Sequence, residues 1–286
     1  MRIGLINWSG HKNLGDDAMA QVLLDFFPKA VNMGEHPTEA DWYILGGGTL
    51  IAPLSQFMAM SPNPEKTIGI SLGVSSNWNG EGVEYLKRFH RIYARDFFSR
   101  EKLKQHGVDA VLSVDLLCAL YKKTELVRKG TMANIMRAPE SIVPTHQQDV
   151  VSALDTLLCD KNYKEWFAMS PDEDLATVTF AYVYTDAVQL LQKMLCTQVV
   201  YATRLHANVL AWVAGVPEIH PVAYDPKVDH FYQRVKHLTP QKAYGIIIGH
   251  LSDIYVDLHL GSDAYNTLKR GLGAPKEEPQ SSDASQ

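Results

Sequence analysis

Short apolar runs alternate with amphipathic segments along most of the chain. The first run, residues 2–7, precedes a polar loop and a segment whose apolar residues recur with helical spacing, namely Met19, Val22, Leu23, Phe26 and Phe27. Further apolar runs lie at 42–45, 67–72, 91–94 and 111–114, with helical patterns at 81–89 and 99–105. Strands that alternate with helices, with glycine at several strand exits, predict a parallel sheet covered by helices on both faces.

The same alternation resumes after a charged stretch at 121–130, which we interpret as a linker. Strands are expected at 132–136, 165–169, 177–182, 198–201 and 216–219, and helices at 147–158, 187–195, 204–214 and from 239 to about 272. The chain is therefore expected to form two α/β domains, 1–125 and 126–272. Residues 273–286 have nothing to bury and are expected to be a disordered tail.

Composition excludes several classes of protein. The 286 residues carry a net charge of −5 without a block of like charge, which gives no electrostatic argument for binding nucleic acid or an anionic membrane. The three cysteines are far apart, which disfavours a disulfide framework. No apolar run approaches the roughly 18 residues of a membrane span, the N-terminal run is too short for a signal peptide, and no cluster has metal-ligand spacing. We expect a soluble cytoplasmic protein without a metal.

Two polar or glycine-rich motifs follow predicted strands. In the first, Gly15 would let the backbone approach a ligand while Asn13, Asp16 and Asp17 hold hydroxyl groups. Equally, Asp16 or Asp17 could cap the following helix, a contribution of about 1 kcal/mol that needs no ligand. The pattern leaves both open.

The second motif has three consecutive glycines, Gly46, Gly47 and Gly48, followed by Thr49. It lacks the Lys-Ser/Thr pair of a P-loop. A tight strand-to-helix turn needs one or two glycines, so three favour a loop whose amide groups face an oxygen-rich ligand.

Four basic residues follow strands of the second half. Arg204 and His206 open an apolar helix, Lys227 follows Pro226 in a stiff loop, and Arg137 follows the strand at 132–136. Each has an ordinary structural alternative. Arg204 could bond a strand-end carbonyl and His206 could pack in the core. Lys227 could lie in a surface turn, and Arg137 could form a salt bridge in the linker. Because helix N-termini and arginines both attract anions, their convergence predicts a basic pocket for a small dianion or trianion.

In this order the motifs resemble those of the polysaccharide pyruvyl transferase family. The matching segments are 13–18, 46–49, 69–73, 94–96 with Ser99, Asp115, 204–207, 215–217 and 224–227. The resemblance implies two Rossmann-like domains facing across a cleft, as in glycosyltransferases of the GT-B type. It also implies transfer of pyruvate from phosphoenolpyruvate, as co-substrate, to two hydroxyls of a saccharide, with formation of a cyclic ketal and release of phosphate.

The resemblance also implies the location of the substrates. Phosphoenolpyruvate would lie against the four basic residues, with His206 as proton donor or phosphate contact and Arg204 and Arg137 holding carboxylate and phosphate. The saccharide, nucleotide- or lipid-linked or free, would lie against the two loops of the first half (Asn13, Gly15, Asp16, Asp17, Gly46, Gly47, Gly48, Thr49). Asp16 or Asp17 would take a proton from the attacking hydroxyl. A nucleotide-sugar-dependent glycosyltransferase and a non-catalytic saccharide-binding protein are the alternatives.

Overall fold

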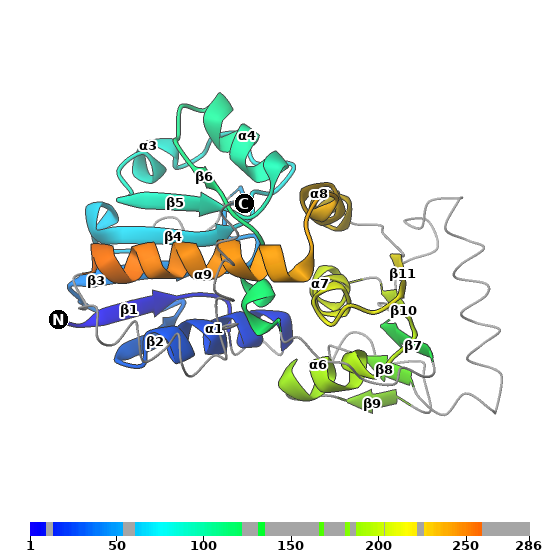
Figure 1. Cartoon of the computed structure of the whole chain (residues 1–286). Coiled ribbons are helices and arrows are strands. Elements are labelled where there is room, and N and C mark those ends of the chain that lie inside the picture. The colour runs from blue at the N-terminus through cyan, green and yellow to red at the C-terminus, as the bar shows by residue number, and fades with distance from the viewer. Residues whose placement is uncertain are drawn as a thin grey trace, which may run out of the picture.

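A six-stranded parallel sheet forms the N-terminal half of the molecule (Figure 1). The computed structural model describes residues 1–9, 14–53, 61–121, 131–134, 166–168, 181–183, 187–202, 204–221 and 226–258. The sheet has the order β2-β1-β3-β4-β5-β6. Its strands are β1 (Ile3–Ile6), β2 (Ala30–Gly34), β3 (Trp42–Gly46), β4 (Thr67–Leu72), β5 (Arg91–Ala94) and β6 (Val111–Leu112). The helices of this half are α1 (Leu14–Phe26), α3 (Val83–Leu86) and α4 (Phe97–Gln105), with 3-10 turns η1 (Pro64–Lys66) and η2 (Leu116–Leu120).

The central strands are buried on both faces, as their continuous apolar sequences predict. Ile44, Ile68 and Ile70 belong to one hydrophobic cluster, whereas Leu45 and Leu72 belong to another on the opposite face. Ile44 and Leu45 are divided between the clusters by the two-residue period of a strand, whereas Leu72, two residues after Ile70, joins the other cluster at the register shift between Gly69 and Leu72. The strand order reverses between β1 and β3, since β2 lies on one side of β1 and β3 on the other. In such sheets ligands bind beyond the carboxyl ends of the strands at this point.

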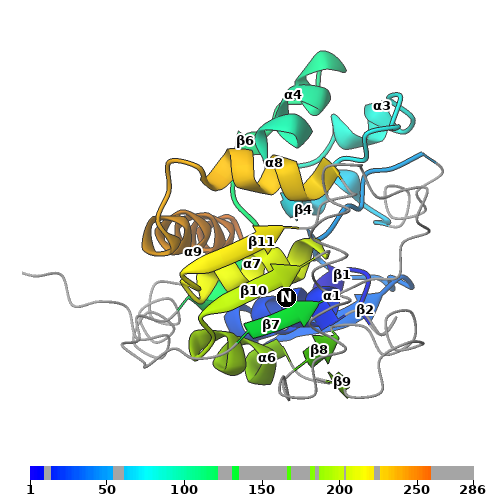
Figure 2. The ribbon, with the colours of Figure 1, turned by 90° about the vertical axis from the view of Figure 1, so that its right-hand side faces the viewer.

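The C-terminal half contains a smaller parallel sheet of order β11-β10-β7, seen from the front in Figure 2. Its strands are β7 (Thr131–Asn134), β10 (Val199–Ala202) and β11 (Glu218–Pro221), and a separate pair consists of β8 (Trp166–Ala168) and β9 (Ala181–Val183). The helices are α6 (Ala187–Leu195), α7 (Leu205–Val213), α8 (Pro226–Val235) and α9 (Pro240–Asp257). The last of these, α9, returns to the N-terminal half, where its Asp257 contacts Arg91 at the start of β5.

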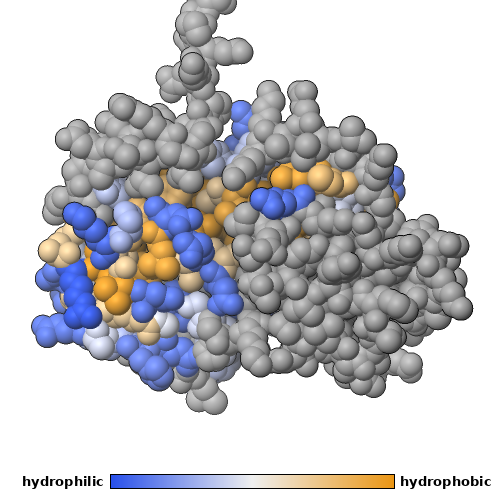
Figure 3. Space-filling model, turned by 90° about the horizontal axis from the view of Figure 1, so that it is seen from below, coloured by the Kyte–Doolittle hydropathy of each residue, from blue (hydrophilic) through white to orange (hydrophobic). Residues whose placement is uncertain are grey.

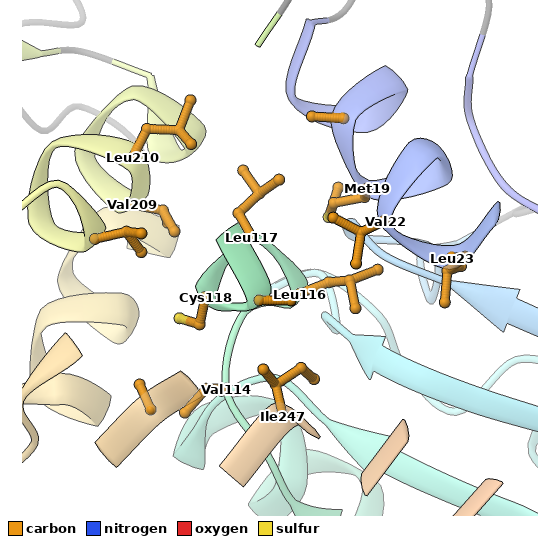
Figure 4. Close-up of a cluster of buried hydrophobic side chains, with 14 of the residues drawn as sticks. Met19, Val22, Leu23, Val114, Leu116, Leu117, Cys118, Val209, Leu210 and Ile247 are labelled. Carbon is orange, nitrogen blue, oxygen red and sulfur yellow. The ribbon is translucent and has the colours of Figure 1, made fainter. Parts of the chain in front are cut away.

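One hydrophobic cluster runs through both halves. The η2 turn lies at its centre, between α1 on one side and α7 and α9 on the others, as Figure 4 shows. The labelled side chains are Met19, Val22 and Leu23 of α1, Val114, Leu116, Leu117 and Cys118 in and before η2, Val209 and Leu210 of α7, and Ile247 of α9. The two halves therefore share a core.

The surface is mixed in character. Seen from below, hydrophobic residues of the N-terminal half lie between hydrophilic ones (Figure 3). The exposed large hydrophobic residues among those described, Met1, Val31, Phe97, Val111 and Val256, come from different elements. Within the described ranges no helix combines the length and apolar character that crossing a membrane requires.

Most expected elements are present, and several need correction. The sequence pattern does not predict β2, η2 or α8, predicts β11 two residues too early, and makes α3 and β6 too long. The strand expected at 177–182 overlaps β9, and its first four residues lie outside the described residues. Lys227 does not lie in a loop, because Pro226 is the first residue of α8, where its fixed φ favours a helix and its missing N–H costs nothing. The helix expected at 147–158, the linker at 122–130, the continuation of the last helix beyond 258 and the tail 273–286 lie outside the described residues.

Candidate functional site

The loop after β3 packs directly on α1 at the carboxyl edge of the sheet. Gly47 and Gly48 have φ angles of 75° and 81°, a region that favours glycine. A Cβ atom on Gly48 would lie 3.1 Å from Asp16 Oδ1, and one on Gly46 would lie 2.3 Å from Leu23 Cδ1. Backbone conformation and close packing on α1 thus account for these glycines. Their contact with a ligand stays a prediction.

Gly15 brings the two halves into contact at this edge. A Cβ atom on Gly15 would lie 2.0 Å from His206 Nδ1 and 2.3 Å from His206 Cγ. The imidazole at the start of α7 therefore lies against the first turn of α1, where only a hydrogen atom fits between them. Two motifs from opposite halves of the sequence meet here.

Asp16 is the buried acid of this contact. Asp16 is 8% exposed, and burial raises the pKa of its carboxyl group. The His206 imidazole opposes that rise in pKa, Asp115 adds to it and Arg95 opposes it. Asp16 and Asp17 both lie within the first turn of α1, which begins at Leu14, so neither is the N-cap that the structural alternative requires. The half-buried Asp17 is the less enclosed of the two.

Asp16 interacts electrostatically with a buried ionic cluster. Arg95 and Asp115 are 3% and 1% exposed, and Arg95 Nη1 is 3.9 Å from Asp115 Oδ2. Arg95 also donates to Thr49 Oγ1 at 3.4 Å and to Asp96 Oδ2 at 3.4 Å. Neither Arg95 Nη1 nor Asp115 Oδ2 has a hydrogen-bond partner among the described residues. All the contacts of the guanidinium are long, so its capacity to donate is not used up.

The two aspartates of this cluster also fix local structure. Asp96 Oδ1 accepts a hydrogen bond of 2.7 Å from Ser99 N and caps α4. Asp115 Oδ1 accepts one of 3.0 Å from Leu117 N and caps η2. In the sequence these residues entered only as part of the family resemblance. The sequence does carry one signal for a role in the site, because Arg95 and Asp96 directly follow a buried strand, where charged groups need a specific partner.

The other predicted residues are distributed as follows. Arg204 is the N-cap of α7 and is half-buried, without a side-chain cap hydrogen bond. His206 is half-buried, and its Nε2 is enclosed without a hydrogen-bond partner among the described residues. Lys227 is half-buried at the start of α8. Asn13 and Arg137 lie outside the described residues.

Ser71 marks local strain at the same edge. Its φ of 54° is the only positive φ of a non-glycine residue in the described ranges. The fully buried hydroxyl donates to the carbonyl of Val114 at 3.0 Å, and the pairing of β4 with β5 shifts register between Gly69 and Leu72. Such a conformation costs about 1–3 kcal/mol and persists where the surroundings impose it.

One comparison with known proteins, that with family models, agrees with the motifs. The family model for polysaccharide pyruvyl transferases matches residues 13–226. No curated protein matches significantly. Among solved structures, an uncharacterised protein of Klebsiella pneumoniae is similar, with 14% identity and a TM-score of 0.48 over 81% of this chain and 87% of that one.

Proposed function

Because the chain belongs to the polysaccharide pyruvyl transferase family, we propose that it transfers pyruvate from phosphoenolpyruvate to two hydroxyls of a saccharide, forming a cyclic ketal and releasing phosphate. The observation that carries the proposal is the contact between Gly15 of α1 and the His206 ring of α7, with buried Asp16 beside it. It brings a candidate acid, a candidate base and two helix N-termini to the point where the strand order reverses. The two halves then correspond to Rossmann-like domains that face each other as in GT-B enzymes.

The donor requires several cations because phosphoenolpyruvate carries a phosphate and a carboxylate on a small skeleton. Arg204 at the N-terminus of α7 and Lys227 at that of α8 combine a positive side chain with the positive end of a helix. Arg137 is the third cation of the proposal. Arg95, whose Nη1 has no hydrogen-bond partner among the described residues, adds a fourth from the N-terminal half.

The reaction balances with one acid and one base. His206 protonates the methylene carbon, while the first hydroxyl attacks the neighbouring carbon and gives its proton to Asp16. The bond to the phosphate oxygen then breaks, with the electron pair leaving on phosphate. The second hydroxyl closes the ketal, and its proton leaves with the phosphate. A carboxylate whose pKa is raised by burial accepts a proton more readily than an exposed one.

The acceptor side is formed by α1 and the loop after β3. Asp16, Asp17 and Thr49 carry side-chain oxygens for saccharide hydroxyls, and Gly15, Gly46, Gly47 and Gly48 lie at the same edge. The Gly47 N–H and the Gly48 carbonyl are already bonded, to Ile70 and Gly73, so the side-chain oxygens are the main acceptor groups of this proposal. The acceptor is nucleotide-linked, lipid-linked or free, and we propose no further cofactor and no metal.

The test is phosphate release from phosphoenolpyruvate in the presence of a panel of free, nucleotide-linked and lipid-linked saccharides. We expect His206→Gln to lower the rate at least about a hundredfold, the typical lower bound for loss of an acid–base group. His237→Gln serves as the matched control, since His237 is exposed beyond the end of α8. Near-normal rates for both His206→Gln and Arg204→Ala would refute the site. Thermal stabilisation by a nucleoside diphosphate but not by phosphoenolpyruvate would point instead to a glycosyltransferase.

A further inference from the structure

Helix α8 packs against the C-terminal half with its apolar face. Val228, Phe231 and Val235 are buried, and the Phe231 ring meets Trp212 of α7 edge-on, with centroids 5.8 Å apart. These residues recur at the spacing of an amphipathic helix. The apolar face therefore ties α8 to α7.

A second face of α8 reaches the N-terminal half. The His230 ring stacks on Phe98 of α4, with centroids 4.2 Å apart and planes 10° from parallel. One turn further on, the Arg234 guanidinium lies 5.4 Å from the centroid of Phe97, and its Nε donates to the carbonyl of Ser113 at 2.6 Å. We call this contact, made by Phe97, Phe98, His230 and Arg234, the α4–α8 bridge.

Both helices of the bridge begin at residues of the candidate site. Helix α4 starts directly after Arg95 and Asp96, and the Asp96 carboxylate caps it. Helix α8 starts at Pro226, and Lys227 is its second residue. His230 follows Lys227 by three positions, so the two lie on neighbouring turns of one side of the helix. Both views of the ribbon place α8 beside the N-terminal half (Figures 1 and 2).

We propose that the α4–α8 bridge fixes the position of Lys227 relative to Arg95, so that Phe98 and His230 are positioning residues for phosphoenolpyruvate. This inference rests on the proposed function. A helical turn is stiff, so holding His230 against Phe98 holds the first turn of α8, which carries Lys227, beside the start of α4, which follows Arg95. A donor with two fixed charged groups binds best when the cations are already at the matching spacing, because no reorganisation is then needed.

The bridge also accounts for aromatic residues that the reaction leaves unexplained. Phe97 is 41% exposed at the first turn of α4, where a hydrophobic side chain has no core to enter. Two guanidinium groups lie over its ring, those of Arg234 and of Arg100, the latter at 5.7 Å. Lys102 lies over Phe98 at 5.5 Å. Cations over the ring faces hold both aromatic rings in place.

Calorimetric titration of the full-length protein with phosphoenolpyruvate tests the inference, together with the melting temperature in the absence of donor. We expect Phe98→Ala and His230→Ala each to weaken binding about two- to twelvefold, the range for loss of one aromatic pair. His230→Phe, which keeps the stack, should restore the affinity. The double variant should bind no more weakly than the weaker single variant, because both changes remove one contact.

The control is His237→Ala, which removes an exposed histidine just beyond the same helix. A role confined to stability would lower the melting temperature of the bridge variants and leave the donor affinity of the folded protein unchanged; that result overturns the inference alone. Should Phe98→Ala fail to fold, Phe98→Leu replaces it under the same expectation. Failure of the wild-type protein to bind phosphoenolpyruvate overturns the proposed function and this inference together.

Discussion

Adding one methyl group at Gly15 should impair the reaction more than it impairs folding. In Gly15→Ala the new Cβ would lie 2.0 Å from His206 Nδ1, against an ordinary contact distance of at least 3.4 Å. The imidazole must therefore retreat by about 1.4 Å, the difference between these two distances. Displacing a reacting group by about 1 Å costs roughly a hundredfold in rate.

The free energy of unfolding of the same variant is set by two opposing effects. Alanine is favoured over glycine in a helix by about 1 kcal/mol, and Gly15 lies in α1 without a positive φ. Crowding of the His206 ring costs about 1–3 kcal/mol, which offsets or exceeds that gain. The net effect on the free energy of unfolding is a loss of at most about 2 kcal/mol.

The assay is steady-state phosphate release beside a denaturant titration. Gly245→Ala is the matched control, because a Cβ at this helical glycine of α9 would meet nothing within 4 Å; it should gain about 1 kcal/mol and keep full activity. Normal turnover by Gly15→Ala would show that the His206 ring position is irrelevant to the reaction. Adding His206→Ala to Gly15→Ala should recover the stability lost to crowding, though not the activity.

Three further changes have definite expected outcomes. Ser71→Gly should be tolerated better than Ser71→Ala by about 1 kcal/mol in urea unfolding, since both lose the hydrogen bond to Val114 and only glycine relieves the positive φ. Burial lowers the pKa of His250, whose ring packs at a tilt against Tyr93 and hydrogen-bonds the Ser113 hydroxyl. Its contribution to stability should therefore be present above the unfolded pKa of about 6.5 and decline as the pH falls below it; in His250→Gln the melting temperature should depend less on pH over that range. Asp16→Asn should raise the melting temperature at neutral pH, corresponding to about 1 kcal/mol, while abolishing phosphate release, because it removes a buried charge whose pKa is raised by desolvation.

Continuous apolar runs allowed the sheet of the N-terminal half to be predicted closely. β4 and β5 have the expected bounds because every residue of β4 and most of β5 is buried, and such strands need no alternation to be recognised. β2 was missed because it is an edge strand with exposed central residues and only short apolar content. Helix α8 was missed because Pro226 suggested a turn, although Val228, Phe231 and Val235 carry a helical repeat.

The site was predictable in composition and not in geometry. The sequence assigns Asp16 to one half and His206 to the other, and only the folded chain shows that Gly15 is the point of contact. The role of Arg95 depends on long-range burial against Asp115 and Thr49, which no local pattern encodes. The glycines at 46–48 have a packing reason on α1 that a sequence cannot distinguish from contact with a ligand.

The position of η2 limits how the chain can be divided. Leu116 and Leu117, both fully buried, pack between α1 (Leu14–Phe26), which precedes them in the sequence, and α7 (Leu205–Val213) and α9 (Pro240–Asp257), which follow them. A fragment truncated near residue 125 would present these leucines to water and should aggregate, and the intact protein should melt in a single calorimetric transition. A chimera that takes one half from a relative would therefore also need the residues of α1, α7 and α9 that pack against this turn.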